Sequence, residues 1–107
     1  MSKPIPAIVI QRAREIISDE QHWCRGSYAR GRAGAPVSIN HPDARRYCAM
    51  GALMLAAQEM SSDFATAEEL VYRAAQIISP TGSLVVTNDY EGHVAVLALF
   101  DAALGTL

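Results

Sequence analysis

The sequence has few aromatic residues, few cysteines and no long hydrophobic run. Only 7% of its 107 residues are aromatic and 2 are cysteine, whereas 50% are hydrophobic. Alanine accounts for a third of the hydrophobic residues. Side chains this small favour closely packed helices over a β-sandwich, which needs more β-branched and aromatic residues. Because no apolar run reaches the roughly 18–20 residues that cross a bilayer, we expect no membrane-spanning helix and no membrane partner.

The N-terminus also lacks the charged, apolar and cleavage regions of a secretory signal peptide, and we therefore expect a cytoplasmic protein. The length suits one helical domain, residues 1–107, which can bury roughly 60–70% of its surface without disulfides or metals. Cys24 and Cys48 each follow an aromatic residue at the start of an apolar stretch. Buried, reduced thiols are the simplest interpretation, while a disulfide and a reactive thiol are the alternatives.

Hydrophobic periodicity predicts a mainly α fold, a compact bundle of about four helices. The predicted helices cover residues 6–19, 42–60 and 66–78, and a last helix follows residue 92 and includes 96–104. Glycines and Pro36 interrupt the helical pattern after the first helix. Residues 27–30 and 36–39 therefore form either a short β-hairpin or an ordered loop of the same path. The short apolar run 84–86 forms either a brief extended segment or a helical turn.

Particular residues mark the starts of two helices. His41 suits the N-cap of the helix that begins at Pro42, since proline fits the first helical position. Thr66 and Glu69 have the spacing of a capping box at the start of the next helix. Gly51 lies inside the second helix, where glycine costs roughly 1 kcal/mol relative to alanine. We expect the backbone of another segment to approach closely at that point.

The net charge of −2 hides a strong separation of charge along the chain. Residues 21–50 contain five arginines and one acidic residue, whereas residues 51–107 contain one arginine and seven acidic residues. We expect the arginines to pair with the acidic half; the alternative is an exposed arginine patch. The chain has no Walker loop, no GxGxxG motif and no known nucleic-acid-binding motif, so we do not expect nucleic acid as a partner.

An exposed patch would alternate aromatic rings with guanidinium groups. Arg25 and Arg45 would then converge with the free N–H groups at the start of the second helix, a combination that binds phosphates or acidic surfaces. Asn88 and Asp89 either fix a local turn or line the same site with their side-chain oxygens. The candidate binding residues are therefore Trp23, Arg25, Tyr28, Arg30, Arg45, Asn88 and Asp89.

The sequence contains residue types that catalyse reactions or bind metals, but not in a recognisable catalytic or metal-binding motif. Cys48, His93 and Asn88–Asp89 have the residue types of a cysteine enzyme, but no local signature accompanies them. Among the possible zinc ligands only His22 and Cys24 are closely spaced, and one intervening residue is too few for the usual zinc knuckle. We expect no catalytic residue, no metal and no cofactor.

Five motifs occur in order along most of the chain. They are Trp23-Cys24-x-Gly26-x-Tyr28-Ala29-Arg30, Pro36-Val37, Asp43-Ala44-x-x-Tyr47-Cys48-Ala49-x-Gly51-Ala52-Leu53, Asn88-Asp89 and Val96-Leu97-Ala98-Leu99-Phe100-Asp101-x-Ala103. Together they resemble an uncharacterised family of small bacterial and phage proteins, a domain of unknown function. Tyr47 stands where that family is expected to have tryptophan, and His41 where a serine cap is usual. The resemblance implies a bacterial or phage cytoplasmic setting, but no activity, substrate or catalytic residue.

These observations lead to two hypotheses about function. The first is a non-enzymatic binding protein that acts on a protein partner or on a second copy of itself, suggested by the Ala- and Gly-lined second helix and the arginine-rich hairpin. The second is a small-molecule or anion binder, or a cysteine-dependent enzyme. Its site would be a pocket between the hairpin, Cys48 and Asn88–Asp89.

Overall fold

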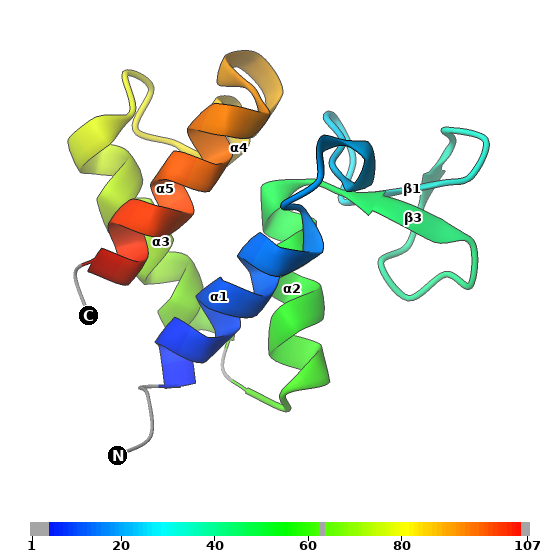
Figure 1. The fold of residues 1–107 in the computed structure, drawn as a ribbon, viewed down its shortest axis with the longest axis horizontal. Helices are drawn as coiled ribbons and strands as arrows, with labels where there is room; N and C mark the ends of the chain where they lie inside the picture. The colour runs from blue at the N-terminus through cyan, green and yellow to red at the C-terminus, as the bar shows by residue number, and fades with distance from the viewer. Residues whose placement is uncertain (1–4, 63, 106–107) are drawn as a thin grey trace.

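Helices form most of the described chain, residues 5–62 and 64–105 of a computed structural model (Figure 1). The helices are α1 (Ile5–Ile16), α2 (Ala49–Glu59), α3 (Phe64–Ile78), the short α4 (Leu84–Val86) and α5 (His93–Gly105). The strands are β1 (Ala29–Gly31), β2 (Pro36–Val37) and β3 (Ala44–Tyr47). The 3₁₀ turn η1 (Glu20–His22) and the π turn η2 (Thr87–Glu91) complete the order. The fold is mostly helical, as predicted, with a short extra helix and a third strand.

The core lies among α1, α2, α3 and α5, and Figure 1 shows α1 between α2 and α5. Ala13 of α1 and Ala52 and Ala56 of α2 are fully buried. Phe100 of α5 is the largest fully buried side chain. Because small side chains let helices approach closely, the alanine-rich composition serves this packing. No helix in the described part of the chain is long and apolar enough to span a bilayer.

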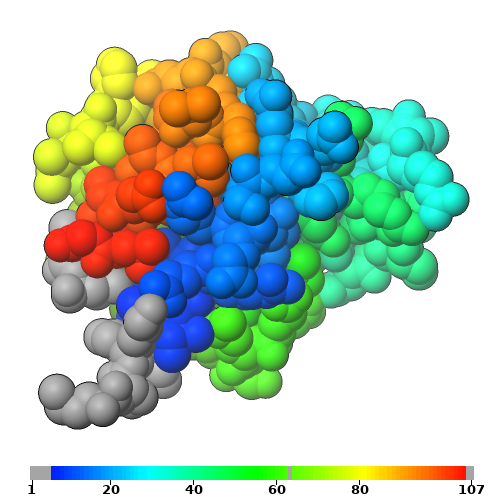
Figure 2. All heavy atoms as spheres, in the orientation of Figure 1, coloured from blue at the N-terminus to red at the C-terminus, as the bar shows by residue number. Residues whose placement is uncertain are grey.

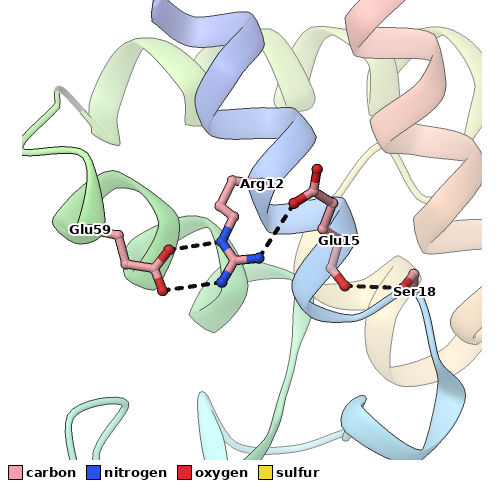
Figure 3. A network of polar contacts seen from close by, with 4 residues as sticks. All are labelled: Arg12, Glu15, Ser18 and Glu59. Atoms are coloured by element: carbon pink, nitrogen blue, oxygen red, sulfur yellow. Dashed lines mark hydrogen bonds and ion pairs between the residues drawn. The ribbon is translucent and has the colours of Figure 1, made fainter.

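Ion pairs on the surface connect α1 to its neighbours. Arg12 Nε donates to Glu59 Oε2 of α2 at 2.8 Å, and the same guanidinium lies 3.4 Å from Glu15 (Figure 3). Arg14 Nε donates to Asp101 Oδ1 of α5 at 2.7 Å. Exposed pairs of this kind contribute up to about 1 kcal/mol each. They therefore help to orient α1, while the buried apolar side chains provide most of its stability.

The sheet projects to one side of α2 and has the strand order β2-β1-β3 (Figure 1). β1 pairs antiparallel with β2, with Ala29 opposite Val37, so the hairpin forms rather than an irregular loop. β1 also pairs antiparallel with β3, with Ala29 opposite Tyr47 and Arg30 opposite Arg46. The central strand of the sheet is thus the first strand of the predicted hairpin.

The second helix begins later than predicted, because β3 occupies its expected first turns. Helix α2 starts at Ala49 with Cys48 as its N-cap, so the predicted start at Pro42 is wrong. His41 Nδ1 instead accepts the N–H of Asp43 at 3.0 Å, in the turn that precedes β3. Pairing with β1 supplies hydrogen bonds from a distant segment, and these outweigh a local helix-start signal.

Two further helix ends differ from the predictions by a few residues. Helix α1 ends three residues early, because Asp19 accepts the N–H of Gln21 at 2.8 Å and begins η1. Helix α3 already includes Phe64, which packs against the core. Thr66 therefore lies inside the helix, and the predicted capping box with Glu69 is wrong.

One carboxylate organises the segment between α3 and α5. Glu91 Oε2 accepts hydrogen bonds from the hydroxyls of Ser79 at 2.8 Å, Thr81 at 3.2 Å and Thr87 at 3.1 Å. Within this segment residues 84–86 form the helical turn α4 rather than an extended segment. The turn places α4 and η2 beside the first turn of α2.

Candidate functional site

Asn88 joins three separate segments of the chain at one buried point. Its side chain is only 2% exposed. Its Oδ1 accepts the indole N–H of Trp23 at 2.6 Å and the backbone N–H of Ala49 at 2.9 Å, and its Nδ2 donates to the carbonyl of Cys24 at 3.0 Å. The amide therefore caps α2, a helix distant in sequence, and holds the segment after α1 against it.

Asp89 holds the neighbouring loop. Its Oδ1 accepts the N–H of Gly26 at 3.0 Å, and Gly26 has φ +77°, a left-handed conformation that favours glycine. Oδ2 makes no hydrogen bond or ion pair within the described residues. Figure 2 shows the segment after α1 and the segment containing η2 side by side on the surface. Together Asn88 and Asp89 fix the relative positions of the hairpin, α2 and η2.

Gly51 allows the hairpin to approach α2. A Cβ on Gly51 would overlap the carbonyl oxygen of Tyr28, and the same carbonyl accepts the N–H of Cys48 at 3.2 Å. The close backbone approach predicted at Gly51 is therefore made, and the approaching segment is the one leading into β1. This contact sets the side chain of Tyr28 at the edge of a hollow.

A pocket of about 580 Å³ lies between the hairpin, α2 and η2. Its walls come from residues 26–28 and 36–39, from Cys48, Met50 and Met54, and from Val85, Asn88 and Asp89. Most of these side chains are apolar, and Asp89 is the charged group among the described lining residues. The volume lies within the range of about 300–1,000 Å³ that is typical of ligand sites.

A second hollow of about 410 Å³ adjoins this pocket. Met50 and Val85 line both, so they form a shared wall. Glu68, Glu69 and Tyr72 line the second hollow alone. The two hollows are neighbours on the surface of α2 and α4, and together they are called the groove.

Both cysteines are free and buried, and Cys48 lines the pocket. Burial raises the pKa of Cys24 to about 11. Burial also raises the pKa of Cys48, although the N–H of Gly51, which donates to its Sγ at 3.3 Å, partly opposes this. A thiol with a raised pKa is almost entirely protonated near neutral pH and is a poor nucleophile.

His93 has structural contacts of its own. Its Nε2 bonds with the carbonyl of Ile17, and its ring centroid lies 5.5 Å from that of Trp23. Cys48, in contrast, bonds with the first turn of α2. No hydrogen bond between Cys48 and His93 is found in residues 5–62 and 64–105. Across the same residues no three His, Cys, Asp or Glu side chains gather as a metal site requires.

The arginines of residues 21–50 do not pair with the acidic half of the chain in the described structure, so that expectation is wrong. Arg30 donates to the carbonyls of Arg25 and Gly34, and Arg45 donates to that of Pro42. The carboxylate that pairs with arginines of this segment is Asp43, which lies 3.7 Å from Arg32 and 4.0 Å from Arg45. The guanidinium of Arg25 lies over the ring of Trp23, 5.1 Å from its centroid.

The structure brings some of the candidate binding residues together and separates others. Tyr28, Asn88 and Asp89 line the pocket, whereas Trp23 is buried behind Asn88. The guanidiniums of Arg25, Arg30 and Arg45 are not part of the lining. Met50, Met54 and Val85 also line the pocket and were not among the predicted residues. Met50 and Met54 lie four residues apart on one face of α2, and this spacing was the available signal.

Comparison with known proteins places the chain in a family. It belongs to DUF6197, a family of unknown function whose model matches residues 1–106. Neither the curated proteins nor the solved structures contain a match. The molecule is thus a small, mostly helical domain with an apolar pocket. The family has no known function, so the pocket is the feature that bears on the function of this chain.

Proposed function

We propose that this chain is a small non-enzymatic binding protein whose binding site is the pocket between the hairpin, α2 and η2. The observation that carries the proposal is the pocket of about 580 Å³ with a mainly apolar lining. A hollow of this size leaves apolar side chains in contact with water, and covering them is favourable. In this role the protein takes up a partner without changing it chemically.

Hydrogen bonds hold the part of the pocket wall that Asn88 and Asp89 form. Asn88 and Asp89 line the pocket and also hydrogen-bond to Trp23, Ala49 and Gly26, which lie on separate segments. A site whose walls are held by such bonds loses little conformational entropy on binding, and this raises affinity.

The alternatives receive less support from the same geometry. A cysteine-dependent enzyme needs a thiolate and a base, whereas burial raises the pKa of Cys48 and His93 bonds with Ile17. An anion binder needs cations in the site, and no lysine, arginine or histidine lines the pocket within the described residues. A small neutral molecule is the second candidate, because the volume suits one.

The proposal includes the bacterial or phage and cytoplasmic setting that the sequence motifs imply. It also includes a protein partner, or a second copy of the chain, as the kind of ligand. The experiments below address the ligand directly.

The proposal is tested by NMR titration of the labelled protein with a panel of neutral aliphatic and aromatic fragments. We expect chemical-shift changes at Tyr28, Met50 and Val85, and dissociation constants at least tenfold weaker in Val85→Arg. The matched control is Val94→Arg on α5, since Val94 is 80% exposed and lies outside both hollows. Shifts that map elsewhere, or equal binding by both variants, would show that the pocket is not the site.

A further inference from the structure

The groove made by the two hollows is lined by apolar side chains and by the carboxylates Asp89, Glu68 and Glu69. We propose that it binds a basic amphipathic segment of a partner protein, with apolar side chains in both hollows and lysine or arginine at the rims. This inference rests on the proposed function and specifies its ligand. Three features of the described residues support it, namely shape, charge and the kind of apolar side chain.

The shape of the groove fits a peptide segment better than a single small molecule. The hollows of about 580 and 410 Å³ share Met50 and Val85 and are therefore neighbours, and an elongated ligand can place one apolar group in each. Tyr28 lines only the first hollow and is 56% exposed, and Tyr72 lines only the second and is 54% exposed. Exposed tyrosines on both sides of a shared apolar wall resemble the anchor positions of protein interfaces.

The charge of the groove is negative. Asp89 lines one hollow and Glu68 and Glu69 line the other, and no basic side chain belongs to either lining within the described residues. Glu69 is partly neutralised by Arg73 at 2.9 Å. Glu68, and Oδ2 of Asp89, have no ion-pair partner in the described chain. A ligand with basic side chains at these two positions therefore gains electrostatic complementarity.

The apolar side chains of the groove are adaptable. Met50 and Met54 lie on the same face of α2, and Met50 lines both hollows. Methionine has three rotatable bonds and a polarisable sulfur, so it repacks around different apolar side chains. Binding surfaces that accept several related segments use methionine in this way.

A second copy of this chain is a poorer occupant of the groove. The arginine-rich hairpin, the basic part of this chain, already forms a wall of the first hollow with Tyr28 and residues 36–39. The exposed apolar side chains outside the groove include Ile77, Tyr90 and Val94, and Glu91 lies between the last two in sequence. Inserting that surface into a groove lined by Glu68 and Asp89 would bring carboxylates together. We therefore assign the groove to a different protein, whose recognised segment is basic.

The experiment is a selection of random 12-residue peptides displayed on phage, with the folded full chain as the target. We expect the recovered peptides to be enriched in apolar residues together with lysine and arginine, and depleted in aspartate and glutamate. Enrichment should be lost on Val85→Arg and kept on Val94→Arg. Acidic peptides, apolar peptides without basic residues, or no enrichment would each overturn the inference.

Charge-neutral variants then test the two carboxylates by fluorescence anisotropy with the best recovered peptide. Glu68→Gln and Asp89→Asn should each weaken binding roughly two- to fivefold at low salt, and the loss should shrink as salt is raised. Glu20→Gln, an equal charge change on η1 outside the groove, should leave affinity unchanged. Equal effects of all three variants would also overturn the inference.

The two proposals can fail separately. If neutral fragments bind at Val85 but no basic peptide is selected, the pocket is a binding site and the assignment of its ligand is wrong. If neither fragments nor peptides bind, the proposed function itself is wrong. If the chain dimerises in analytical ultracentrifugation and Val85→Arg abolishes the dimer, the occupant is a second copy and the inference is overturned.

Discussion

The side-chain amide of Asn88 satisfies polar groups on two distant segments, including the first backbone N–H of α2. Asn and Asp before a helix usually bond to their own turn, and the sequence pattern allowed either that role or a place in a site. In the structure Asn88 reaches Trp23, Cys24 and Ala49 instead. All of its polar atoms are satisfied, and it is fully enclosed, so its replacement removes partners from buried groups that have no access to water.

We predict that Asn88→Ala lowers the free energy of unfolding by about 3–5 kcal/mol. The substitution leaves an indole N–H, a backbone N–H and a carbonyl unsatisfied, at roughly 1–3 kcal/mol for each buried group. Urea denaturation followed by tryptophan fluorescence measures the change at Trp23. The control is Asn40→Ala at an exposed position, which should change stability by less than about 0.5 kcal/mol. A loss below 1 kcal/mol for Asn88→Ala would contradict the bridging role.

At the scale of elements, the join between the hairpin and α2 decides the shape of the pocket. Tyr28, which precedes β1, offers its carbonyl to Cys48, and Gly51 leaves room for it. The N-cap of α2 is a cysteine, whose sulfur accepts the N–H of Gly51 at 3.3 Å. Glycine has a low helix propensity, but at position 51 it is needed because the backbone of Tyr28 passes too close to α2 for any Cβ.

We predict that Gly51→Ala destabilises the protein by about 2 kcal/mol or more, although alanine is the better helix former by roughly 1 kcal/mol. The added Cβ would overlap the Tyr28 carbonyl and force the hairpin away from α2. Thermal unfolding followed by circular dichroism measures the effect. Gly105→Ala is the matched control, since a Cβ there meets nothing within 4 Å, and its stability should be unchanged or slightly higher. Equal behaviour of the two variants would show that the close approach is unimportant.

Across the molecule as described, the arginines of residues 21–50 form no ion pair with the acidic residues of 51–107. In the described residues the ion pairs of the helices involve Arg12, Arg14 and Arg73, while the arginines of the sheet region pair with Asp43. Five of the ten described acidic residues lie on the long helices, and the others lie in the turns and short helical segments between them. The charged side chains that line the groove within the described residues are Asp89, Glu68 and Glu69, and Arg73 pairs with Glu69.

The two thiols are buried because several packed elements exclude water from them. We predict that Cys24 and Cys48 react slowly with iodoacetamide at pH 7 in the folded protein, and much faster in urea. The folded protein should react faster as pH rises toward the pKa of Cys24, about 11. Rapid alkylation of native protein at pH 7, measured by mass spectrometry, would revive the cysteine-enzyme hypothesis.

The same raised pKa values make stability fall at high pH. The folded protein keeps protons that the unfolded chain releases above the ordinary thiol pKa of 9.0. The thiol contribution to stability is therefore complete below pH 9 and is lost as pH rises toward 11. Urea midpoints at pH 8, 9 and 10 measure this loss, and Cys24→Ser should reduce the slope between them. A midpoint that rises over that range would contradict the direction of the shift.

Much of the fold could be predicted because its signals are local. The apolar stripe of α1, the later helices and the Gly- and Pro-marked hairpin depend on neighbours within a few residues. Strand β3 could not, because its partner β1 lies about fifteen residues earlier and Pro42 after His41 favours a helix locally. The pocket was anticipated between the hairpin, Cys48 and Asn88–Asp89, while the side chains of Met50 and Val85 were not.

The amino-acid sequence alone was enough to predict a small, mostly helical protein with a hairpin after its first helix, and to suggest a family of unknown function. The folded structure was needed to see that Asn88 hydrogen-bonds to Trp23 and Ala49, and that the arginines of residues 21–50 make no ion pair with the acidic half in the described chain. It also decided that the groove is apolar and acidic. Periodicity and capping arise from contacts a few residues apart, whereas a groove is made by side chains from distant segments. Their meeting depends on how whole elements pack.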